Sequence, residues 1–261
     1  MLGRRVAAGI GSWIPAAVLA LVVLLIWEVV LSALNVQSFL LPRPSVIADQ
    51  LVTLWPTTLQ RGAIFTGGEA LAGLVVGVSL GTLAGLGTAR WAFARTTVIP
   101  LGIGASTIPI IAFAPIGLNW FGPESPLPRV IIVTLMVFFP VLVNTIRGLT
   151  EVDPGALELM ASYAATDVQT VRKLRIPNAL PYWFTALRIA ATLSVIGAVV
   201  GEFFGGPLYS LGIYITNQTS ISDYPKAWAA IALACALGIA FYMAASVAER
   251  LLVPWGAARE R

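Results

Sequence analysis

The sequence contains no histidine and only one cysteine, Cys235. Without histidine the usual Ser–His proton relay cannot be built, and with one cysteine neither an internal disulfide nor a CxxC metal pair can form. Neither Lys173 nor Lys226 follows a glycine, so the Gly-Lys-Ser/Thr of a Walker A loop is absent as well. We therefore expect this chain to be no enzyme, to hold no metal and no cofactor, and to bind no ATP itself.

Charged residues are also scarce, at 11% of the chain, whereas hydrophobic residues make up 58% and the mean hydropathy is +0.87. These values are far from those of soluble domains. The formal net charge is +4, but the basic residues are scattered at the edges of apolar runs, so we expect no nucleic-acid partner. The composition predicts an all-α, polytopic membrane protein in which residues 1–261 form a single transmembrane domain.

Six apolar segments are long enough to cross a lipid bilayer as helices. They are Ile14–Leu34, Ala70–Thr88, Val98–Trp120, Val130–Ile146, Tyr182–Val200 and Ala227–Ala248. The third contains Pro100, Pro109 and Pro115, which predict a kinked or discontinuous helix. Residues 35–69 are polar enough to lie outside, with a short amphipathic stretch over residues 46–54 at the interface.

Lysine and arginine are distributed unevenly between the two sides that these spans define. Eleven lie on the side of both termini: Arg4, Arg5, Arg90, Arg95, Arg147, Arg172, Lys173, Arg175, Arg250, Arg259 and Arg261. Four lie on the other side: Arg43, Arg61, Arg129 and Lys226. Because cytoplasmic connections carry the excess of positive charge, we expect both termini in the cytoplasm and the chain in the cytoplasmic membrane.

The longest cytoplasmic connection, residues 147–180, has the pattern of two short helices. Asp153 is a helix N-cap before Pro154, and the apolar residues Leu157, Met160, Ala161 and Ala164 then recur at helical spacing. A second helix starts at Thr166–Asp167, and Pro177 and Pro181 are expected to stop it before the fifth span. The residues alone leave two interpretations open: an apolar docking face, or a basic loop tethered to lipid headgroups by residues 172–175.

Two motifs in this connection resemble the EAA loop of binding-protein-dependent ABC importer permeases. Glu158 matches the glutamate of that loop, Ala164 stands where its glycine usually sits, and Leu174, Ile176 and Pro177 match its I-x-L-P end, while Leu159 and Met160 replace the usual two alanines. In that family the loop is the coupling helix that docks in a groove of the cytoplasmic ATPase. The resemblance assigns this role to Leu157, Glu158, Met160, Ala161, Ala164, Ala165 and Pro177.

Further patterns extend the resemblance over nearly the whole chain. Trp27-Glu28, residues 39–45, residues 138–145, Leu187–Ala190 and residues 201–206 are similar to patterns of the nitrate, sulfonate, taurine and pyrimidine-precursor branch. The resemblance implies a six-helix permease of the type I ABC importer fold that transports a small solute. It also implies the partners: ATP-binding cassette ATPase subunits, a second permease subunit (expected as a homodimer), and an extracytoplasmic substrate-binding protein. Residues 187–202 look closest to permeases for heterocyclic vitamin precursors.

Four glycines, Gly73, Gly77, Gly81 and Gly85, recur every fourth residue along the second span and form one face. Such a face lets another helix backbone approach closely, either as static packing or as a sliding surface. Polar residues near the spans are the candidates for the translocation pathway: Asn144, Thr185, Arg188 and Glu202.

Each charged candidate also has an alternative explanation. Glu28 and Glu69 are expected to be solvated at the interface, Arg188 to reach the interface or pair with a carboxylate, and Glu202 to close an outer gate or end its helix. The alternative function is a secondary transporter or channel that uses Glu28, Arg188 and Glu202 as an ion relay.

Overall fold

A computed structural model describes residues 14–89, 91 and 94–255 of the chain. The described residues form helices and connections without strands. In chain order the α-helices are α2 (Ile14–Ala33), α3 (Pro44–Leu54), α4 (Gln60–Thr88), α5 (Ile99–Ser106), α6 (Ala114–Phe121), α7 (Leu127–Thr150), α8 (Pro154–Ser162), α9 (Asp167–Thr170), α10 (Ile176–Glu202), α11 (Leu211–Ser220) and α12 (Tyr224–Leu252). Arg4, Arg5, Arg90, Arg259 and Arg261, which entered the charge count, lie outside the described residues.

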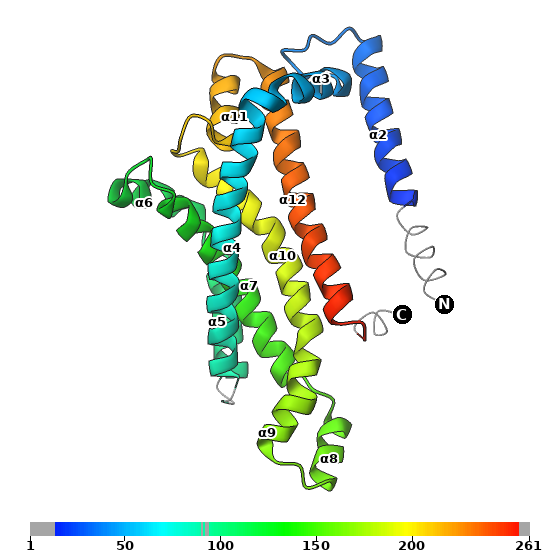
Figure 1. Cartoon of the computed structure of the whole chain (residues 1–261), viewed down its shortest axis with the longest axis vertical. Coiled ribbons are helices and arrows are strands. Elements are labelled where there is room, and N and C mark those ends of the chain that lie inside the picture. The colour runs from blue at the N-terminus through cyan, green and yellow to red at the C-terminus, as the bar shows by residue number, and fades with distance from the viewer. Residues whose placement is uncertain (1–13, 90, 92–93, 256–261) are drawn as a thin grey trace.

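The long helices run side by side along the longest axis of the molecule, and α8 and α9 project from one end (Figure 1). Helix α7 packs against both α4 and α10, and α10 also packs against α12. Their shared core contains valines of α7 (Val133, Val137, Val141) and small residues of α10 and α12 (Ala186, Ala190, Ala229, Ala230). Small side chains bring the helix backbones close together, as is typical of packing in membranes.

Four helical runs in the described chain are long and apolar enough to cross a membrane: 44–88, 127–150, 167–202 and 224–252. A fifth candidate is a broken span, because Thr96–Ser106 and Ile110–Phe121 are bent by 68°. The predicted discontinuity of the third span is therefore confirmed. Helix α2, with its 20 residues, is shorter than the four, and six spans are reached only if both it and the bent pair cross.

The second span begins earlier than the sequence indicated. Helix α4 starts at Gln60 and not at Ala70, and α3 joins it through a π-turn over Trp55–Leu59. The predicted start of this helix at Ala70 is therefore wrong, whereas the location of residues 60–69 outside the bilayer stays a prediction. The polar residues Thr66 and Glu69 made this segment look like a connection outside the helix. In the structure both side chains are buried against other helices and are not in contact with solvent.

The two prolines near the fifth span do not stop the helix. A continuous helical run extends from Asp167 to Glu202, with a π-turn over Val171–Arg175 just before Pro177. Pro181 lacks the N–H that would bond to the Pro177 carbonyl, and the indole Nε1 of Trp255 lies 3.5 Å from that oxygen. The expected helix end is wrong, because the helix continues through both prolines and the carbonyl that Pro181 leaves free has the Trp255 indole N–H beside it.

Helix α2 stands apart from the bundle and touches it at one end (Figure 1). There the rings of Trp27 and Trp228 meet edge to face at 5.5 Å. The Glu28 carboxylate accepts hydrogen bonds from the backbone N–H and the hydroxyl of Ser45, at 3.0 and 2.8 Å. Glu28 therefore stabilises the N-terminus of α3, as an interfacial carboxylate is expected to do.

Candidate functional site

Helices α8 and α9 form a hairpin, residues 151–175, at one end of the bundle (Figure 1). The Asp153 carboxylate accepts a hydrogen bond from the Gly155 N–H at 3.1 Å, with Pro154 in the first turn of α8. Thr166 and Gln169 form a reciprocal capping box at the start of α9. Both predicted helix starts are confirmed, and the bonds that define them are local.

The end of α8 differs from the prediction. The helix stops at Ser162, and Ala164 lies beyond it with φ = 48°. The Ala165 N–H bonds to the Met160 carbonyl at 3.0 Å and the Ala164 N–H to the Ala161 carbonyl at 2.9 Å, the pattern of a Schellman motif. The prediction that Ala164 continues the helical face is wrong. A left-handed residue in this position explains why a glycine suits the corresponding place in the EAA loop.

The exposed apolar surface of the hairpin includes residues that the sequence pattern did not select. Leu159 is 56% exposed, Tyr163 77% and Val168 75%. Among the predicted docking residues, Glu158, Ala161 and Ala164 are exposed, whereas Leu157, Met160, Ala165 and Pro177 are half-buried. Large apolar side chains exposed at a projecting element are available for contact with another molecule.

The base of the hairpin is joined firmly to the bundle. The Asn178 side-chain amide donates to the Gly148 carbonyl at 2.8 Å and to the Glu151 carbonyl at 3.2 Å. Arg175 Nη1 donates to the Leu149 carbonyl at 3.3 Å, so the free carbonyls at the end of α7 have partners. A Cβ added at Gly148 would lie 2.7 Å from Ala179 Cα. A force applied to the hairpin would therefore act on α7 and α10 together.

A cavity of about 350 Å³ lies at the break of the bent span. Its walls come from the break, from α7 and from α10: Ser106, Ile108, Pro109, Ile110, Ile111, Met136, Phe139, Pro140 and Leu193. Among the described residues, no charged side chain lines it. The cavity offers apolar and aromatic contacts, a hydroxyl group, and the backbone groups of a broken helix.

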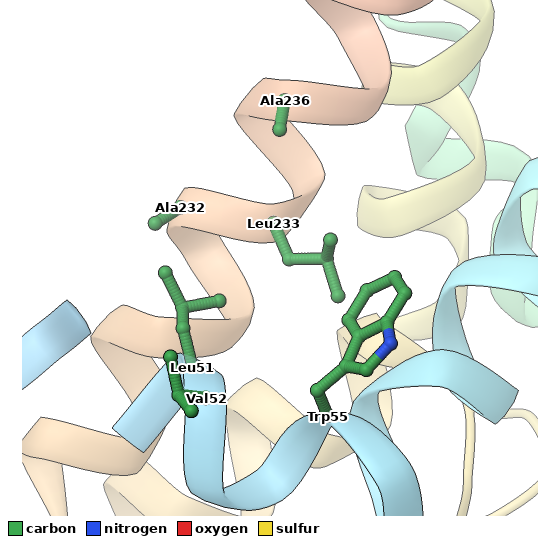
Figure 2. A pocket seen from close by; sticks show the side chains of 6 residues that line it. All are labelled: Leu51, Val52, Trp55, Ala232, Leu233 and Ala236. Carbon is green, nitrogen blue, oxygen red and sulfur yellow. The ribbon is translucent and has the colours of Figure 1, made fainter. Parts of the chain in front are cut away.

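A second hollow, of about 430 Å³, opens between the α3–α4 junction and α12 (Figure 2). Leu51, Val52, Trp55, Ala232, Leu233 and Ala236 line it. Apart from the indole nitrogen of Trp55, the side chains drawn there carry no polar atom. A surface of this kind suits hydrocarbon and supplies no specific contact for a polar solute.

The four candidate pathway residues do not come together. Asn144 donates to the Pro140 carbonyl of its own helix at 2.8 Å, and Glu202 is fully buried at the end of α10. Arg188 contacts Thr185 at 3.3 Å and forms an ion pair with Glu249 of α12, also at 3.3 Å. The pairing that the sequence left open for Arg188 is thus present. None of the four lines the cavity at the bent span.

The four glycines of α4 all lie against α7. A Cβ at Gly77 would lie 2.8 Å from the Thr134 carbonyl oxygen, and one at Gly81 would lie 2.8 Å from that of Phe138. Gly73 meets Val133 and Gly85 meets Thr145 in the same way. The side chains of α7 that these four positions meet also recur at intervals of four: Val133, Val137, Val141 and Thr145. The two helices therefore share one long, close interface.

Sequence reasoning missed a buried cluster at the end of the bundle opposite the hairpin. Glu69, expected at the interface, is buried in an ion pair with Arg129, which was counted as a loop cation and is 0% exposed. The Glu202 carboxylate accepts a hydrogen bond from Thr66 at 2.7 Å. The available signal was an arginine close to the start of an apolar run, with two acids in separate spans. We call Glu69, Thr66, Arg129 and Glu202 the buried cluster.

Comparison with known proteins identifies the family of this chain. The family described as "Binding-protein-dependent transport system inner membrane component" matches residues 73–255. The chain belongs to that family. It is therefore a membrane-spanning permease and not an enzyme, and the matched region includes α7, the hairpin and α10.

Individual relatives agree with this assignment. The chain is 34% identical to the formylaminopyrimidine transport permease protein ThiX of Halalkalibacterium halodurans, over 90% of this chain and 93% of that one. It is 30% identical to the riboflavin transport system permease protein RibX of Chloroflexus aurantiacus, over 91% and 88% respectively. A solved structure of the MetNI methionine ABC transporter in inward-facing conformations matches with a TM-score of 0.55 at 18% identity, covering 77% of this chain and 96% of that chain. The fold is that of an ABC importer permease.

Proposed function

We propose that two copies of this permease form the pathway of an ATP-driven importer, with ATPase subunits bound to the hairpins and a substrate-binding protein at the opposite end. The hairpin is the observation that carries this proposal. Its exposed Leu159, Tyr163 and Val168 give the family's coupling element an apolar contact surface, to which Glu158, Ala161 and Ala164 are adjacent. ATP is then bound by the partner and not by this chain.

Movement of the ATPase subunits is transmitted to the membrane-spanning helices through the base of the hairpin. Closure of two nucleotide-bound ATPases draws the two hairpins together, and the contacts of Asn178 and Gly148 pass this displacement to α7 and α10. Both helices line the cavity at the bent span. Nucleotide thereby biases one element between two arrangements, inward-facing and outward-facing.

The solute that fits best is an uncharged nitrogen heterocycle. The cavity contains Phe139, Met136 and Ser106 but no charged side chain to balance an anion such as a sulfonate. The two reported relatives are named for formylaminopyrimidine and riboflavin, which are both nitrogen heterocycles. Uptake of labelled formylaminopyrimidine that falls in Phe139→Ala supports this class. Uptake of a sulfonate, with no competition by formylaminopyrimidine, contradicts it.

The proposed orientation places the hairpin and both termini in the cytoplasm. Helix α2 begins and α12 ends toward the hairpin end of the bundle, where Arg147, Arg172 and Lys173 also lie (Figure 1). In a Cys235→Ser background, a cysteine at Ser125 should react with a membrane-impermeant thiol reagent in intact cells, and one at Thr170 should not. Labelling at Thr170 alone would reverse the orientation.

Coupling is tested by placing a charge on the exposed face of the hairpin. Leu159→Asp and Ala164→Asp should abolish uptake, because an unpaired carboxylate buried at the interface costs several kcal/mol, on the order of the whole contact energy. The permease should remain folded, since both positions are exposed in the isolated chain. Co-purification of the ATPase and stimulation of its ATP hydrolysis by the binding protein are the measurements.

Two controls separate docking from attachment to lipid. Leu208→Asp alters a residue of the α10–α11 connection that is 78% exposed and should leave ATPase binding intact. The combined neutralisation of Arg172, Lys173 and Arg175 should matter most if the hairpin only attaches to anionic headgroups. Normal uptake by Leu159→Asp and Ala164→Asp, together with loss of uptake in the neutralised variant, would replace the docking proposal with the lipid one.

A further inference from the structure

The buried cluster joins segments that lie far apart in the sequence. Arg129, near the start of α7, donates from Nε to both oxygens of Glu69 on α4, at 2.8 and 2.9 Å. Its Nη1 donates to the Pro123 carbonyl at 3.2 Å and to the Gly205 carbonyl at 2.8 Å. One guanidinium group thus contacts α4, the α6–α7 connection and the α10–α11 connection.

Glu202 connects the end of α10 to the start of α11. One carboxylate oxygen accepts from the Thr66 hydroxyl at 2.7 Å and the other from the Gly212 N–H at 2.6 Å. The Thr66 oxygen in turn accepts from the Leu211 N–H at 3.1 Å. The first N–H groups of α11 are therefore satisfied by side chains of α4 and α10.

The two acids are neighbours in the fold, because Glu202 accepts from Thr66, one helical turn before Glu69 on α4, and Gly201, beside Glu202, lies against Arg129. Glu69 is 4% exposed, and Glu202 and Arg129 are 0% exposed. Two ionised carboxylates beside one guanidinium would leave a net negative charge buried among the helices. Two carboxylates that share a site do not both ionise readily, and one bound proton makes the cluster neutral.

The other cations near this end of the described structure interact with partners outside the buried cluster. Arg61 of α4 lies over the Tyr209 ring at 5.6 Å, and Lys226 of α12 pairs with Asp223 at 2.7 Å. Glu124 follows Pro123 in the α6–α7 connection and would add negative charge, not remove it. No second cation therefore reaches the acid pair within the described residues.

Two buried donors without a partner lie on one side of the cluster. Among the described residues, Arg129 Nη2 and the Ser210 hydroxyl have no hydrogen-bond partner. They lie near one another, because a Cβ at Gly206 would be 3.4 Å from both Arg129 Nη1 and Ser210 Oγ. Groups of this kind are commonly satisfied by internal water, which also conducts protons between solvent and an acid.

We propose that Glu69 and Glu202 together bind a single proton, and that the protonated pair with Arg129 locks the α10–α11 connection and α11 onto α4 and α7. This proton site lies outside the coupling hairpin and the proposed pathway. When the lock opens, both acids meet water and ionise at neutral pH, so the locked state holds one proton more than the open state. The lock therefore weakens as pH rises. Each pH unit favours opening about tenfold between the ordinary pKa of a free glutamate, about 4.3, and the pH at which the locked pair itself loses its proton, and above that pH opening no longer depends on pH.

Hydrogen exchange in the complete transporter, reconstituted in nanodiscs, measures the lock directly. Between about pH 6 and about pH 9, protection of residues 203–220 in the native protein should fall by about tenfold per pH unit until the locked pair itself has lost its proton, and then level off, after correction for intrinsic exchange. Glu202→Gln should remove this dependence, because an amide at this position is neutral without a proton. The oxygen of the introduced amide can still accept from the Gly212 N–H, and its NH₂ group can donate to Thr66. Glu69→Gln should behave likewise.

The double variant Glu69→Gln/Glu202→Gln removes both acids and should open the lock instead of closing it. It leaves Arg129 buried without an anion, so residues 203–220 should lose protection at every pH. If that variant fails to fold, the single variants still decide the question. Identical pH profiles for the native protein and Glu202→Gln would overturn the proposal.

Infrared spectroscopy gives an independent readout. A protonated carboxyl group has a C=O stretch distinct from that of a carboxylate, and the native protein at neutral pH should show it. Either single variant should lack this band, because the remaining acid then pairs with Arg129 as an anion. A native spectrum without the band would show that both acids are ionised and would exclude the proton site.

Discussion

The two ends of the bundle are organised by opposite kinds of contact. In the buried cluster, Arg129 and Glu69 are 60 residues apart in sequence, and Thr66 and Glu202 are 136 apart. In the hairpin, Asp153 bonds two residues ahead and Thr166 pairs with Gln169 three residues ahead. The first end has every charge of its cluster buried, whereas the second exposes large apolar side chains.

This difference indicates that the buried cluster contributes to stability and that the hairpin serves recognition of a partner. Long-range polar contacts inside the helix bundle hold several segments in one arrangement, because an unpaired buried group is strongly unfavourable. Local caps shape the hairpin without burying it, so its surface stays available to a partner. We expect substitutions at the cluster to change folding and substitutions at the hairpin to change assembly.

Arg129→Met should produce the largest effect. It leaves two buried acids without their cation, and breaking a buried pair in this way lowers the free energy of unfolding by about 3–5 kcal/mol. Arg175→Met, at the base of the hairpin, should lower it by less than about 1 kcal/mol. Thermal unfolding in detergent compares the two variants, and equal midpoints would show that the cluster adds no more than a surface contact.

Gly77→Ala tests whether α4 and α7 are also closely packed between the buried cluster and the hairpin. A Cβ there would lie 2.8 Å from a carbonyl oxygen of α7, and overpacking of this kind costs about 1–3 kcal/mol. The same change at Gly87, where a Cβ would meet no other atom within 4 Å, should be neutral or stabilising by up to about 1 kcal/mol. Similar unfolding midpoints for the two variants would mean that α4 and α7 separate readily.

Two threonines allow the same chemical change at both ends. Thr66→Ala removes a donor to Glu202 and an acceptor for Leu211 and should cost about 1–3 kcal/mol of global stability. Thr166→Ala removes an N-cap and should cost about 1 kcal/mol, confined to the hairpin. Hydrogen exchange distinguishes a loss of protection throughout the chain, expected for Thr66→Ala, from a loss confined to the hairpin, expected for Thr166→Ala. Global loss of protection in Thr166→Ala would show that the hairpin is part of the folding core.

A change confined to one turn is expected at Ala164. Because its φ of 48° is unfavourable for residues with a Cβ, Ala164→Gly should stabilise the hairpin by about 1 kcal/mol, and Ala164→Val should destabilise it. Exchange rates of the N–H groups of residues 163–166 measure both effects. A slower exchange in the valine variant than in the glycine variant would contradict the left-handed turn.

The hairpin was the more predictable of the two ends. Asp153, Pro154 and Thr166 indicated both helix starts, because a capping side chain acts on backbone groups two or three residues away. The same local signals failed at Ala164, where the turn is set by the Schellman bonds and not by the residue's preference. They failed also at Pro181, because Trp255, far along the chain, lies beside the carbonyl that this proline leaves free.

The sequence by itself determined the membrane class, the apolar segments, the break at the bent span and the family, because composition, proline positions and motifs are read along one chain. Only the tertiary structure decided that Glu69 and Arg129 are buried partners and that Glu202 caps α11. Charged residues at the edge of an apolar run look the same whether they face solvent or another helix. Which they face depends on the packing of α4, α7 and α10 against one another, and that packing is a property of the folded bundle.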